Sequence, residues 1–297
     1  MTERFKEEMA ERVQYAEEVI SAYLPKAEGF QKTVLSAGNY SVQAGGKRLR
    51  PIIMEETYRL FDGKGKQIEP FMAAIEMIHS SSLVHDDLPC MDNDTMRRGK
   101  PSTWYQYGEA MGVLAGDALM IYAFETAAKA FTGNPNPAPV GRAIRVLAEK
   151  TGVYGMIGGQ TVDVEKNGEN LSPEELDFVF RLKTGALIEA SMMIGAILAG
   201  ASEEDIENCE KIADKIGVAF QIQDDILDVT STTEELGKPV HSDERNEKTT
   251  FVSLYGLDKA REEVRRLSME AVELLHGLSG ENKFLEELLI SLIERKN

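Results

Sequence analysis

Two aspartate-rich segments are the part of this 297-residue chain best suited to chemistry. The second segment, residues 224–228, reads DDILD, and its first and last aspartates share one face of a helix because they are four residues apart. The same face carries apolar residues at the preceding four-residue steps, namely Ile212, Ile216 and Phe220. Ionised Asp224, Asp225 and Asp228 on such a face need a cation, and hard carboxylate oxygens without His or Cys partners suit Mg²⁺.

The first segment, DDLPCMDND at residues 86–94, follows a stretch with helical spacing of apolar residues. Pro89 is expected to end that helix, which leaves Asp86 and Asp87 in its last turn, at the negative end of the helix dipole. Bound divalent ions would remove this conflict. Three cations follow directly and suit the oxygens of a diphosphate held by those ions, namely Arg97, Arg98 and Lys100.

Two further segments are weaker candidates for binding an anion. The sequence GGKRLRP at residues 45–51 combines two glycines, which let the backbone approach a ligand, with three cations, and it lacks the spacing of a Walker loop. The sequence KTG at residues 183–185 contributes a single Lys within a predicted helix. Taken alone, either segment is as well explained by a solvated surface.

Composition restricts the class of protein. The formal net charge of −17 opposes binding to nucleic acid or to an anionic membrane, and it calls for metal ions between the acids and any anionic substrate. Two cysteines, Cys90 and Cys209, are too few for a disulfide framework and fit a reducing compartment. The charged amino terminus lacks the apolar core of a signal peptide, and no uninterrupted apolar run approaches the roughly 20 residues of a membrane span. We therefore expect a cytoplasmic protein without an integral membrane segment.

Helical periodicity dominates the sequence, and no convincing series of short alternating strands interrupts it. The clearest helix start is the capping box Ser172–Glu175, and this helix should run to about Gly200. A second helix should start at Ser202. Breaks too short for an interdomain linker are expected near residues 62–65, 133–139 and 236–239. The sequence thus predicts an all-α fold with a single domain over residues 1–297.

Taken together, six separated motifs resemble the trans-isoprenyl diphosphate synthase family, especially its short-chain bacterial farnesyl and geranylgeranyl diphosphate synthases. The motifs occur in the family's order over roughly residues 40–255: GGKRLRP, DDLPCMDNDTMRRGKPS, GGQ at residues 158–160, KTGALIEAS, FQIQDDILD and GKPVHSD. The resemblance implies a bundle of about ten helices around a central cavity, with the two aspartate motifs facing each other across its mouth. It also implies a homodimer and Mg²⁺, as three ions when substrate is bound.

The resemblance implies roles for individual residues. Metal ions would be bound by Asp86, Asp87 and Asp92 of the first motif and by Asp224, Asp225 and Asp228 of the second. Isopentenyl diphosphate would be bound by Gly46, Lys47, Arg50, His79 and Arg98. The allylic diphosphate would be bound by Arg97, Lys183, Thr184, Gln221 and Lys238, with Lys183, Thr184 and Gln221 at the catalytic centre. Without the resemblance, His79 and Gln221 would be interpreted as interior hydrogen-bonding residues.

The activity implied by the resemblance is magnesium-dependent, head-to-tail transfer of a prenyl group. Isopentenyl diphosphate would condense with dimethylallyl, geranyl or farnesyl diphosphate to give farnesyl (C15) or geranylgeranyl (C20) diphosphate plus diphosphate. A class I terpene cyclase is an alternative, but its second motif has the form (N/D)Dxx(S/T)xxxE, whereas this chain has Asp228 and Thr232 at the discriminating positions. A non-catalytic regulatory subunit of a prenyl synthase is another alternative, which the intact acids of both motifs disfavour.

The helix before the first motif is predicted to act as a ruler for product length. Steps of four residues back from Asp86 place Ser82 and Ile78 on one face, about 6 Å apart along the helix axis, which is comparable to one isoprene unit. A growing chain would pass Ser81 and Ser82 and then meet Met77 and Ile78. Short-chain family members that stop at C15 often carry an aromatic residue at the position of Ser81. Its absence here leaves C15 and C20 open and disfavours C10.

Overall fold

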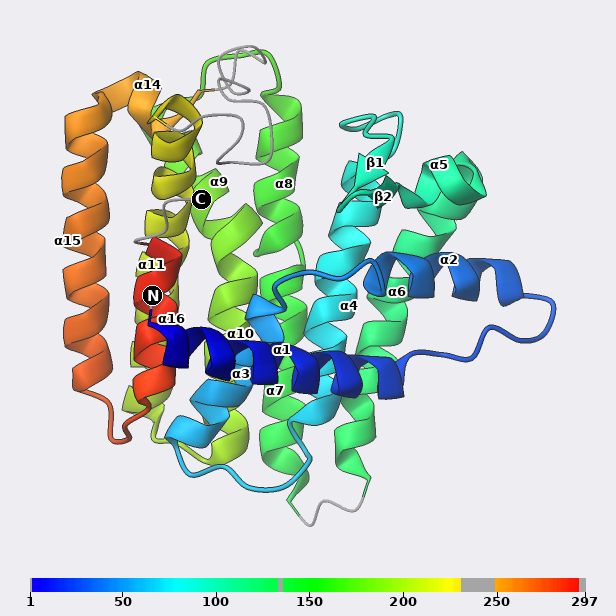
Figure 1. Ribbon diagram of the computed structural model, residues 1–297, viewed down its shortest axis with the longest axis horizontal. Coiled ribbons are helices and arrows are strands. Elements are labelled where there is room, and N and C mark those ends of the chain that lie inside the picture. The colour runs from blue at the N-terminus through cyan, green and yellow to red at the C-terminus, as the bar shows by residue number, and fades with distance from the viewer. Residues whose placement is uncertain (1, 133–135, 231–248, 294–297) are drawn as a thin grey trace.

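The computed structural model describes residues 2–132, 136–230 and 249–293, which form helices and one short β-hairpin (Figure 1). In chain order the helices are α1 (Glu3–Tyr23), α2 (Lys32–Val42), α3 (Leu49–Leu60), α4 (Glu69–Asp86), α5 (Thr103–Tyr107), α6 (Glu109–Ala128), the 3₁₀ turn η1 (Lys129–Phe131), α7 (Pro137–Thr151), α8 (Met156–Glu165), α9 (Pro173–Val179), the π-helical turn η2 (Phe180–Gly185), α10 (Ala186–Ala199), α11 (Glu203–Thr230), α14 (Phe251–Tyr255), α15 (Leu257–His276) and α16 (Lys283–Ile293). The strands β1 (Met96–Arg97) and β2 (Lys100–Pro101) pair antiparallel. Because this hairpin is the only sheet in the described residues, the all-α prediction is confirmed.

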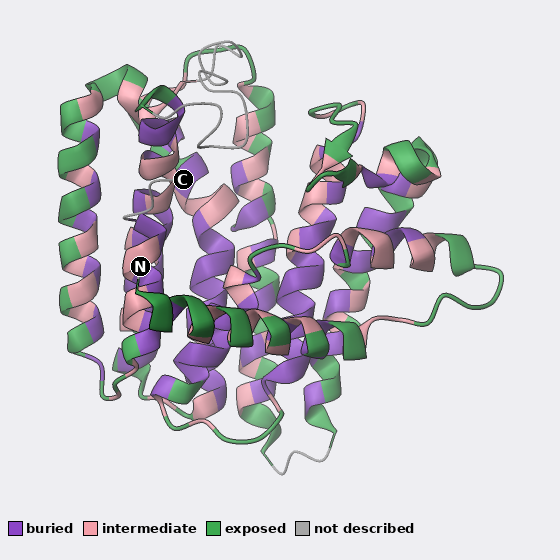
Figure 2. Ribbon diagram, in the orientation of Figure 1, coloured by how far each residue is buried: buried purple, intermediate pink, exposed green. Residues whose placement is uncertain are grey.

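Helix α10 forms the centre of the bundle. Its sequence, ALIEASMMIGAILA, is apolar on almost every side, and a helix of that kind is stable only when it is surrounded by other helices. It packs against α3, α7 and α11. Figure 2 shows α10 buried along most of its length, whereas α1 and α15 each keep an exposed side. One hydrophobic cluster contains buried residues from α1 through to α16.

The long helix predicted from Ser172 to about Gly200 is present. The Ser172 hydroxyl accepts a hydrogen bond from the backbone N–H of Glu175 at 3.2 Å, and the Glu175 carboxylate accepts one from the backbone N–H of Ser172 at 2.8 Å. Gly200 ends the helix in a left-handed conformation, with φ 82°. Between these ends the sequence did not predict η2, the π-helical turn that separates α9 from α10.

The two helices that carry the aspartate motifs end at the same end of the bundle, the upper end in Figure 1. Helix α4 stops at Asp86, as predicted from Pro89, and α11 begins at Glu203 after Ser202, also as predicted. The break predicted at residues 62–65 separates α3 from α4. Part of the break at 133–139 and the whole of the break at 236–239 lie outside the described residues. This topology places both motifs and the β-hairpin around one end of the molecule.

Within the part of the chain that the structure describes, two helices are long and apolar enough to cross a membrane by length and composition alone. One spans Pro173–Ala199, and 72% of its most apolar 18-residue stretch is buried inside the bundle. The other spans Glu109–Phe131, and only 39% of its most apolar 18-residue stretch is buried, so part of its apolar surface faces outward. The expectation of a chain without an integral membrane segment stays a prediction.

Candidate active site

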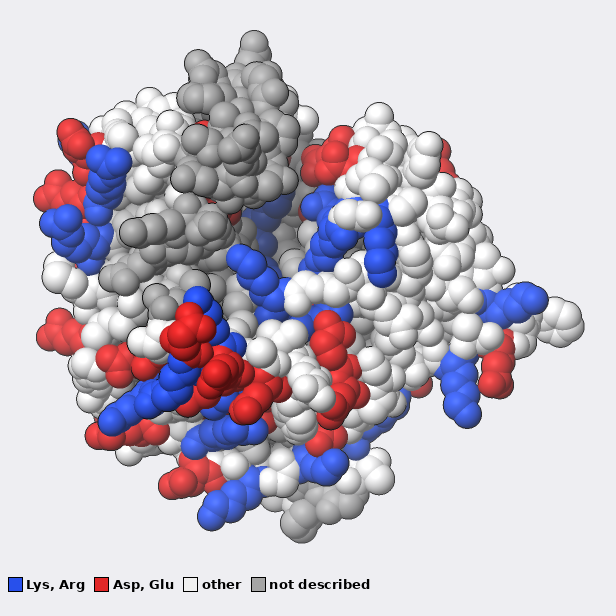
Figure 3. Space-filling view, in the orientation of Figure 1, with Lys and Arg blue, Asp and Glu red and all other residues white. Residues whose placement is uncertain are grey.

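A hollow lies at the end of the bundle where α4 and α11 stop. Figure 3 shows it between the part of the molecule that contains α8 and α11 and the part that carries the β-hairpin and α5. Lys and Arg side chains gather on its walls (Figure 3). Two neighbouring cavities occupy this region, one mainly apolar and one mainly polar.

The apolar cavity has a volume of about 940 Å³ and is bounded by α4, α6, α8 and η2. Its apolar wall includes Leu83, Met120, Ile121, Met156 and Ile157. Polar groups on the same wall include Arg50, His79, Asp86 and Gln160. A space of this volume and lining suits a hydrocarbon chain that ends in a charged group.

The polar cavity has a volume of about 240 Å³ and lies beside the second aspartate motif. Its wall includes Asp163 of α8 together with Gln221, Asp224 and Asp225 of α11. The loop that follows α8 closes one side with residues 166–169. The predicted residues Gln221, Asp224 and Asp225 are therefore brought together, in a space suited to a small charged group.

Lys183 and Thr184 lie on the walls of both cavities. They belong to η2, and single π-helical turns inside α-helices occur frequently at functional sites. A Cβ atom on Gly159 of α8 would lie 2.2 Å from the backbone N of Lys183, and one on Gly217 of α11 would lie 2.8 Å from Cα of Gly185. These two glycines let α8 and α11 approach the turn closely from two directions.

Helix α8 supplies partners to both sides of the site. The Nζ of Lys183 lies 2.6 Å from Oδ2 of Asp163. One turn earlier in α8, Nε2 of Gln160 donates a hydrogen bond to Oδ1 of Asp86 at 2.7 Å. In this structure α8 therefore compensates the charge of Lys183 and also contacts the first aspartate motif.

The first motif folds back on itself. The backbone N–H of Asp92 donates to the carbonyl of Asp86 at 2.9 Å, which brings the third aspartate beside the first. Asp87 is buried, and its Oδ1 accepts from Nε of Arg97 at 2.9 Å and from Nη2 of the same guanidinium. The Nη2 also lies 3.3 Å from Oδ2 of Asp94. The motif thus combines an exposed aspartate, a half-buried one and a buried one that is already paired with a cation.

Burial makes ionisation of this motif difficult. The pKa of Asp86 is raised to about 6, chiefly by burial and then by the charges of Asp92 and Asp87, although Lys183 and Arg97 oppose the shift. Burial also raises the pKa of Asp87, against the opposing effect of Arg97. A bound divalent cation would stabilise the ionised form of both carboxylates.

The second motif contains one accessible and two buried aspartates. Asp224 is half-buried and lies on the wall of the polar cavity. Asp225 is 7% exposed, and its Oδ2 accepts a hydrogen bond at 2.7 Å from the backbone N–H of Phe251, at the start of α14. Asp228 is 2% exposed. Asp224 is accordingly the member of this motif best placed to reach a ligand in the cavity.

Positive charge gathers around His79. Burial lowers the pKa of His79 well below its usual value, and four guanidinium groups lower it further, those of Arg50, Arg98, Arg48 and Arg97. The Nε of Arg50 is buried and has no hydrogen-bond partner among the residues that the structure describes. Gly46 lies against Arg98, since a Cβ there would be 2.9 Å from Cζ of that guanidinium. A cationic region therefore brings together four of the residues predicted to bind isopentenyl diphosphate: His79, Arg50, Arg98 and Gly46. The fifth, Lys47, is exposed beside this region.

Arg48 corrects the interpretation of GGKRLRP as a segment with three cations for an anion. It has a left-handed backbone, with φ 49°, and its side chain is fully buried. Its guanidinium lies 2.7 Å from Oε1 of Glu17 and 2.5 Å from Oε1 of Glu76. It also donates to the carbonyl of Val42 at 2.6 Å. Arg48 is thus a structural cation that joins α1, α3 and α4.

The predicted chain-length residues occupy two kinds of position on α4. Ser82 lies on the wall of the apolar cavity. Ser81, Met77 and Ile78 are fully buried. The Oγ of Ser81 lies 3.9 Å from Sδ of Met120, which is itself on the cavity wall. A larger residue at position 81 can therefore act on the cavity through Met120.

The donor set of the two motifs fits Mg²⁺, because it consists of carboxylate oxygens. Within the described residues, no three His, Cys, Asp or Glu side chains are placed to hold an ion by themselves. Mg²⁺ is usually bound by one or two carboxylates, with water and substrate phosphates completing its coordination. A site that is completed by a diphosphate therefore does not need such a group.

Two residues of the site, Gln160 and Asp163, are missing from the predicted set. Gln160 is the last residue of the GGQ motif and was given no role, and Asp163 follows it by one turn of α8, so helical spacing from this motif was the signal that could have identified Asp163. Lys238 lies outside the described residues, as does the whole GKPVHSD motif.

The chain matches the polyprenyl synthetase family over residues 31–283. It is 42% identical to farnesyl diphosphate synthase of Geobacillus stearothermophilus over 255 residues, which are 86% of this chain and 85% of that protein. It is 44% identical to the chloroplastic geranylfarnesyl diphosphate synthase of Leucosceptrum canum over 276 residues, which are 92% of this chain and 75% of that one.

Solved structures show the same fold. An FPP/GFPP synthase from Zymomonas mobilis superimposes with a TM-score of 0.87 at 32% identity, over 99% of this chain and 100% of that one. A geranyltransferase from Helicobacter pylori, solved in complex with magnesium and isoprenyl diphosphate, gives a TM-score of 0.81 at 31% identity, over 99% and 97% of the two chains. The chain therefore belongs to the polyprenyl synthetase family and is a prenyltransferase with the all-α fold of isoprenoid synthases.

Proposed function

We propose that this chain condenses isopentenyl diphosphate with dimethylallyl, geranyl and farnesyl diphosphates to give farnesyl (C15) or geranylgeranyl (C20) diphosphate plus diphosphate. The observation that carries this proposal is the position of Lys183 and Thr184 on the wall shared by the polar and the apolar cavity. A substrate with a charged head and a hydrocarbon tail can occupy both spaces at once. The similarity to farnesyl and geranylfarnesyl diphosphate synthases supports products of this class.

Mg²⁺ is the metal that we place between the two motifs and the allylic diphosphate. Three ions with substrate bound would be held by Asp86, Asp87, Asp92, Asp224, Asp225 and Asp228. When bound, Mg²⁺ stabilises the negative charge that develops on the leaving diphosphate. The magnesium and isoprenyl diphosphate in the Helicobacter pylori geranyltransferase support the choice of metal.

The allylic diphosphate is contacted by Lys183, Thr184, Gln221, Arg97 and Lys238 in this proposal. Lys183 and Arg97 are paired with Asp163 and Asp87 here, so binding requires them to exchange a carboxylate for a diphosphate oxygen. Such pairs keep half-buried charges compensated while no substrate is bound.

The reaction begins when the allylic carbon–oxygen bond breaks and both electrons leave with the diphosphate. The resulting allylic cation lies against the apolar cavity wall, which excludes water and so prevents hydrolysis. The double bond of isopentenyl diphosphate supplies the electron pair for the new carbon–carbon bond, and the released diphosphate accepts the proton that is lost. Gly46, Lys47, Arg50, His79 and Arg98 hold the second diphosphate during this step.

The experiment that tests this function is incubation of the purified protein with Mg²⁺, isopentenyl diphosphate and C5, C10 or C15 allylic partners. Product chain lengths and released diphosphate are measured. We expect C15 and C20 diphosphates and no reaction of the allylic substrate alone. Conversion of the allylic substrate alone to a hydrocarbon would identify a cyclase, and no turnover with any pair would identify a non-catalytic subunit.

A homodimer with α6 at its interface is also proposed. This helix exposes three large apolar residues. Leu114 is 49% exposed and lies on the wall of neither cavity, whereas Val113 and Ile121, which are 40% and 70% exposed, also border the apolar cavity. Acids at Asp117 and Glu125 on the same helix disfavour contact with an anionic membrane. Light scattering should give the mass of two chains, and Leu114→Asp should shift it toward one. A wild-type mass of one chain would contradict the proposal.

A cytoplasmic location and a single domain over residues 1–297 complete the proposal. The net charge of −17 and the two free cysteines, Cys90 and Cys209, support the location. The continuous hydrophobic cluster from α1 to α16 supports the single domain. Cell fractionation tests the former, and a single calorimetric unfolding transition tests the latter.

A further inference from the structure

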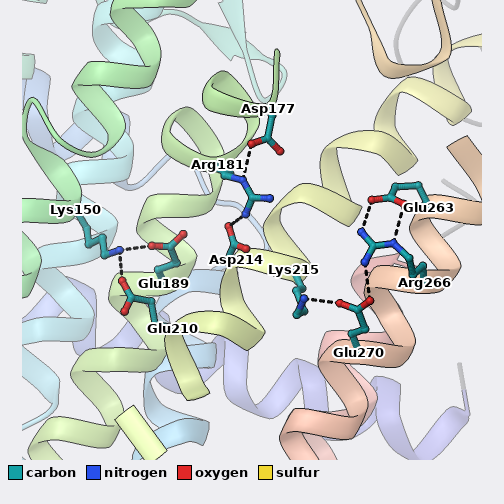
Figure 4. Close-up of polar contacts among 10 residues, drawn as sticks. All are labelled: Lys150, Asp177, Arg181, Glu189, Glu210, Asp214, Lys215, Glu263, Arg266 and Glu270. Carbon is teal, nitrogen blue, oxygen red and sulfur yellow. Dashed lines mark hydrogen bonds and ion pairs between the residues drawn. The ribbon is translucent and has the colours of Figure 1, made fainter. Parts of the chain in front are cut away.

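Arg181 contacts two carboxylates on the side of η2 that faces away from the cavities. It precedes Lys183 by two residues, and side chains two residues apart lie on nearly opposite sides of a helix. Its Nε donates to Oδ2 of Asp177 at 2.7 Å, and its Nη1 contacts Oδ1 of Asp214. Figure 4 shows the guanidinium between these carboxylates. Since Asp177 lies on α9 and Asp214 on α11, Arg181 joins the turn to two helices.

Asp214 belongs to a row of two acids on one face of α11, Glu210 and Asp214, and each of them is paired with a cation. Glu210 and Asp214 are four residues apart on this helix, and like charges at that spacing repel. Lys150 lies 2.6 Å from Oε1 of Glu210 and also contacts Glu189 of α10. Arg181 supplies the cation for Asp214 (Figure 4). Each acid of the row is thus paired with a cation from a neighbouring helix.

The π-helical turn interrupts the α-helical hydrogen-bonding pattern between α9 and α10, so contacts with neighbouring elements help to hold it. The glycines at positions 159 and 217 fix how closely α8 and α11 approach the turn. Phe180 of the turn is buried as well, so the side of η2 that is left to a polar restraint is the half-buried side that carries Arg181. The ion pair from Arg181 to Asp214 supplies that restraint from the back of the turn.

The geometry points to Arg181, paired with Asp214, as a positioning residue that holds the back of η2 and so keeps Lys183 and Thr184 on the wall shared by the two cavities. Arg181 lies on the wall of neither cavity, as far as the described residues show, and so acts through the turn and not through contact with substrate. This inference rests on the proposed function, because it takes Lys183 and Thr184 to bind the allylic diphosphate.

The test compares Arg181→Gln with a matched control, Arg266→Gln. Arg266 on α15 is likewise held by two carboxylates, with Nε 2.9 Å from Glu263 and Nη1 2.6 Å from Glu270. We expect Arg181→Gln to lower kcat by about tenfold or more and to raise KM for the allylic diphosphate several-fold, because small displacements of a binding group have large kinetic effects. KM for isopentenyl diphosphate should stay within about twofold of wild type. Arg266→Gln should leave all three constants unchanged.

Two further variants keep the test decisive if Arg181→Gln folds poorly. Arg181→Lys retains the charge but lacks the planar guanidinium that directs separate N–H groups at the two carboxylates, and it should give an intermediate loss of kcat. The exchanged pair, Arg181→Asp combined with Asp214→Arg, restores that ion pair but leaves Asp177 beside a second acid, so it should recover part of the kcat that each single substitution loses. Recovery in the exchanged pair identifies the ion pair itself, and the same loss in the pair as in the singles would overturn the inference.

Lys183→Ala is measured in parallel to separate this inference from the proposed function. If Lys183→Ala loses activity while Arg181→Gln behaves like Arg266→Gln, the inference is wrong and the proposed function stands. If Lys183→Ala keeps wild-type kinetics, the assigned diphosphate site is wrong. If Arg181→Gln lowers the Tm and weakens the binding of both substrates equally, the role of Arg181 is structural and the inference is again wrong.

Discussion

Gln160 and Asp86 join α8 to the end of α4, with Nε2 of the amide 2.7 Å from Oδ1 of the carboxylate. Asp86 stands where burial and the negative end of a helix dipole both disfavour an ionised acid, and its pKa is raised to about 6. The neutral amide of Gln160 offsets only part of the free energy that ionisation of Asp86 costs. The site is therefore less stable without a cation than with one, and this has measurable consequences.

Asp86→Asn is expected to stabilise the metal-free protein while abolishing turnover. The substitution keeps the shape of the side chain and the acceptor for Gln160 but removes a buried negative charge. The shift of the pKa from its usual 3.8 to about 6 corresponds to an increase in the free energy of unfolding on the order of 1 to 3 kcal/mol at pH 7.5. Chemical unfolding in EDTA measures it, with the exposed Glu281→Gln as control. Equal stability of Asp86→Asn and wild type would contradict the burial cost.

The loss of stability caused by ionised Asp86 should depend on pH in a defined direction. Because the folded protein holds the proton of Asp86 more tightly than the unfolded chain does, stability from this group falls as pH rises from 3.8 to about 6. This loss of stability is complete above about pH 6. The difference in stability between Asp86→Asn and wild type should accordingly shrink as pH falls through this range. A difference that stays constant from pH 7.5 to pH 4.5 would exclude Asp86 as its source.

Metal binding should show the complementary effect. Mg²⁺ needs the ionised carboxylate, so the Mg²⁺ concentration for half-maximal turnover should rise as pH falls below about 6, by up to about tenfold per pH unit for each proton displaced. Turnover is measured at saturating substrates, with the Mg²⁺ concentration varied at each pH. A half-maximal concentration that does not change between pH 7.5 and pH 5.5 would contradict this account of Asp86.

Substitution of the two arginines in GGKRLRP should affect different properties, protein stability for Arg48 and substrate binding for Arg50. Arg48→Ala leaves Glu17 and Glu76 without their shared cation, and loss of one partner of a buried pair costs about 3 to 5 kcal/mol of stability. Arg50→Ala and Lys47→Ala should instead raise KM for isopentenyl diphosphate by about tenfold or more. Urea unfolding and steady-state kinetics of the three variants test this division. Wild-type KM values in Arg50→Ala and Lys47→Ala would place this segment outside the active site.

Ser81→Phe is expected to shorten the products. Ser81 is fully buried against Met120, so a phenyl ring there must push Met120 into the apolar cavity or enter the cavity itself. Either movement reduces the space for the growing chain. Mass spectrometry of products at equal conversion measures the effect, with Ser81→Ala as a control that adds no volume. An unchanged distribution in Ser81→Phe would show that position 81 does not limit chain length.

The sequence predicted those parts of the fold that depend on local signals. The capping box at Ser172, the helix end before Pro89 and the helix start after Ser202 each act within a few residues, and the structure has all three. The π-helical turn at η2 was not predictable in this way. It depends on close approach at Gly159 and Gly217, two glycines that are distant from the turn in sequence and adjacent to it only after folding.

Long-range pairing also explains the remaining differences in the site. Arg48 and Arg50 are indistinguishable by residue type, and only the buried carboxylates of Glu17 and Glu76 separate the structural cation from the one on the cavity wall. Asp163 has no obvious role in the sequence until Lys183 lies 2.6 Å from it. Motif spacing therefore predicted candidate metal and substrate residues, whereas their partners, such as Asp163 and Glu76, became visible only in the tertiary structure.

The most direct measurement is Mg²⁺-dependent product formation by wild type, Asp86→Ala and Asp224→Ala, with isopentenyl and dimethylallyl diphosphates as substrates. Both aspartates reach the cavities from opposite motifs, so each variant should lose several orders of magnitude in turnover. Circular dichroism should show the helix content of wild type in both. Wild-type turnover should also stop in EDTA and return when Mg²⁺ is added. Turnover near the wild-type rate in either variant at limiting Mg²⁺ would contradict the assignment of a metal-binding site to both motifs.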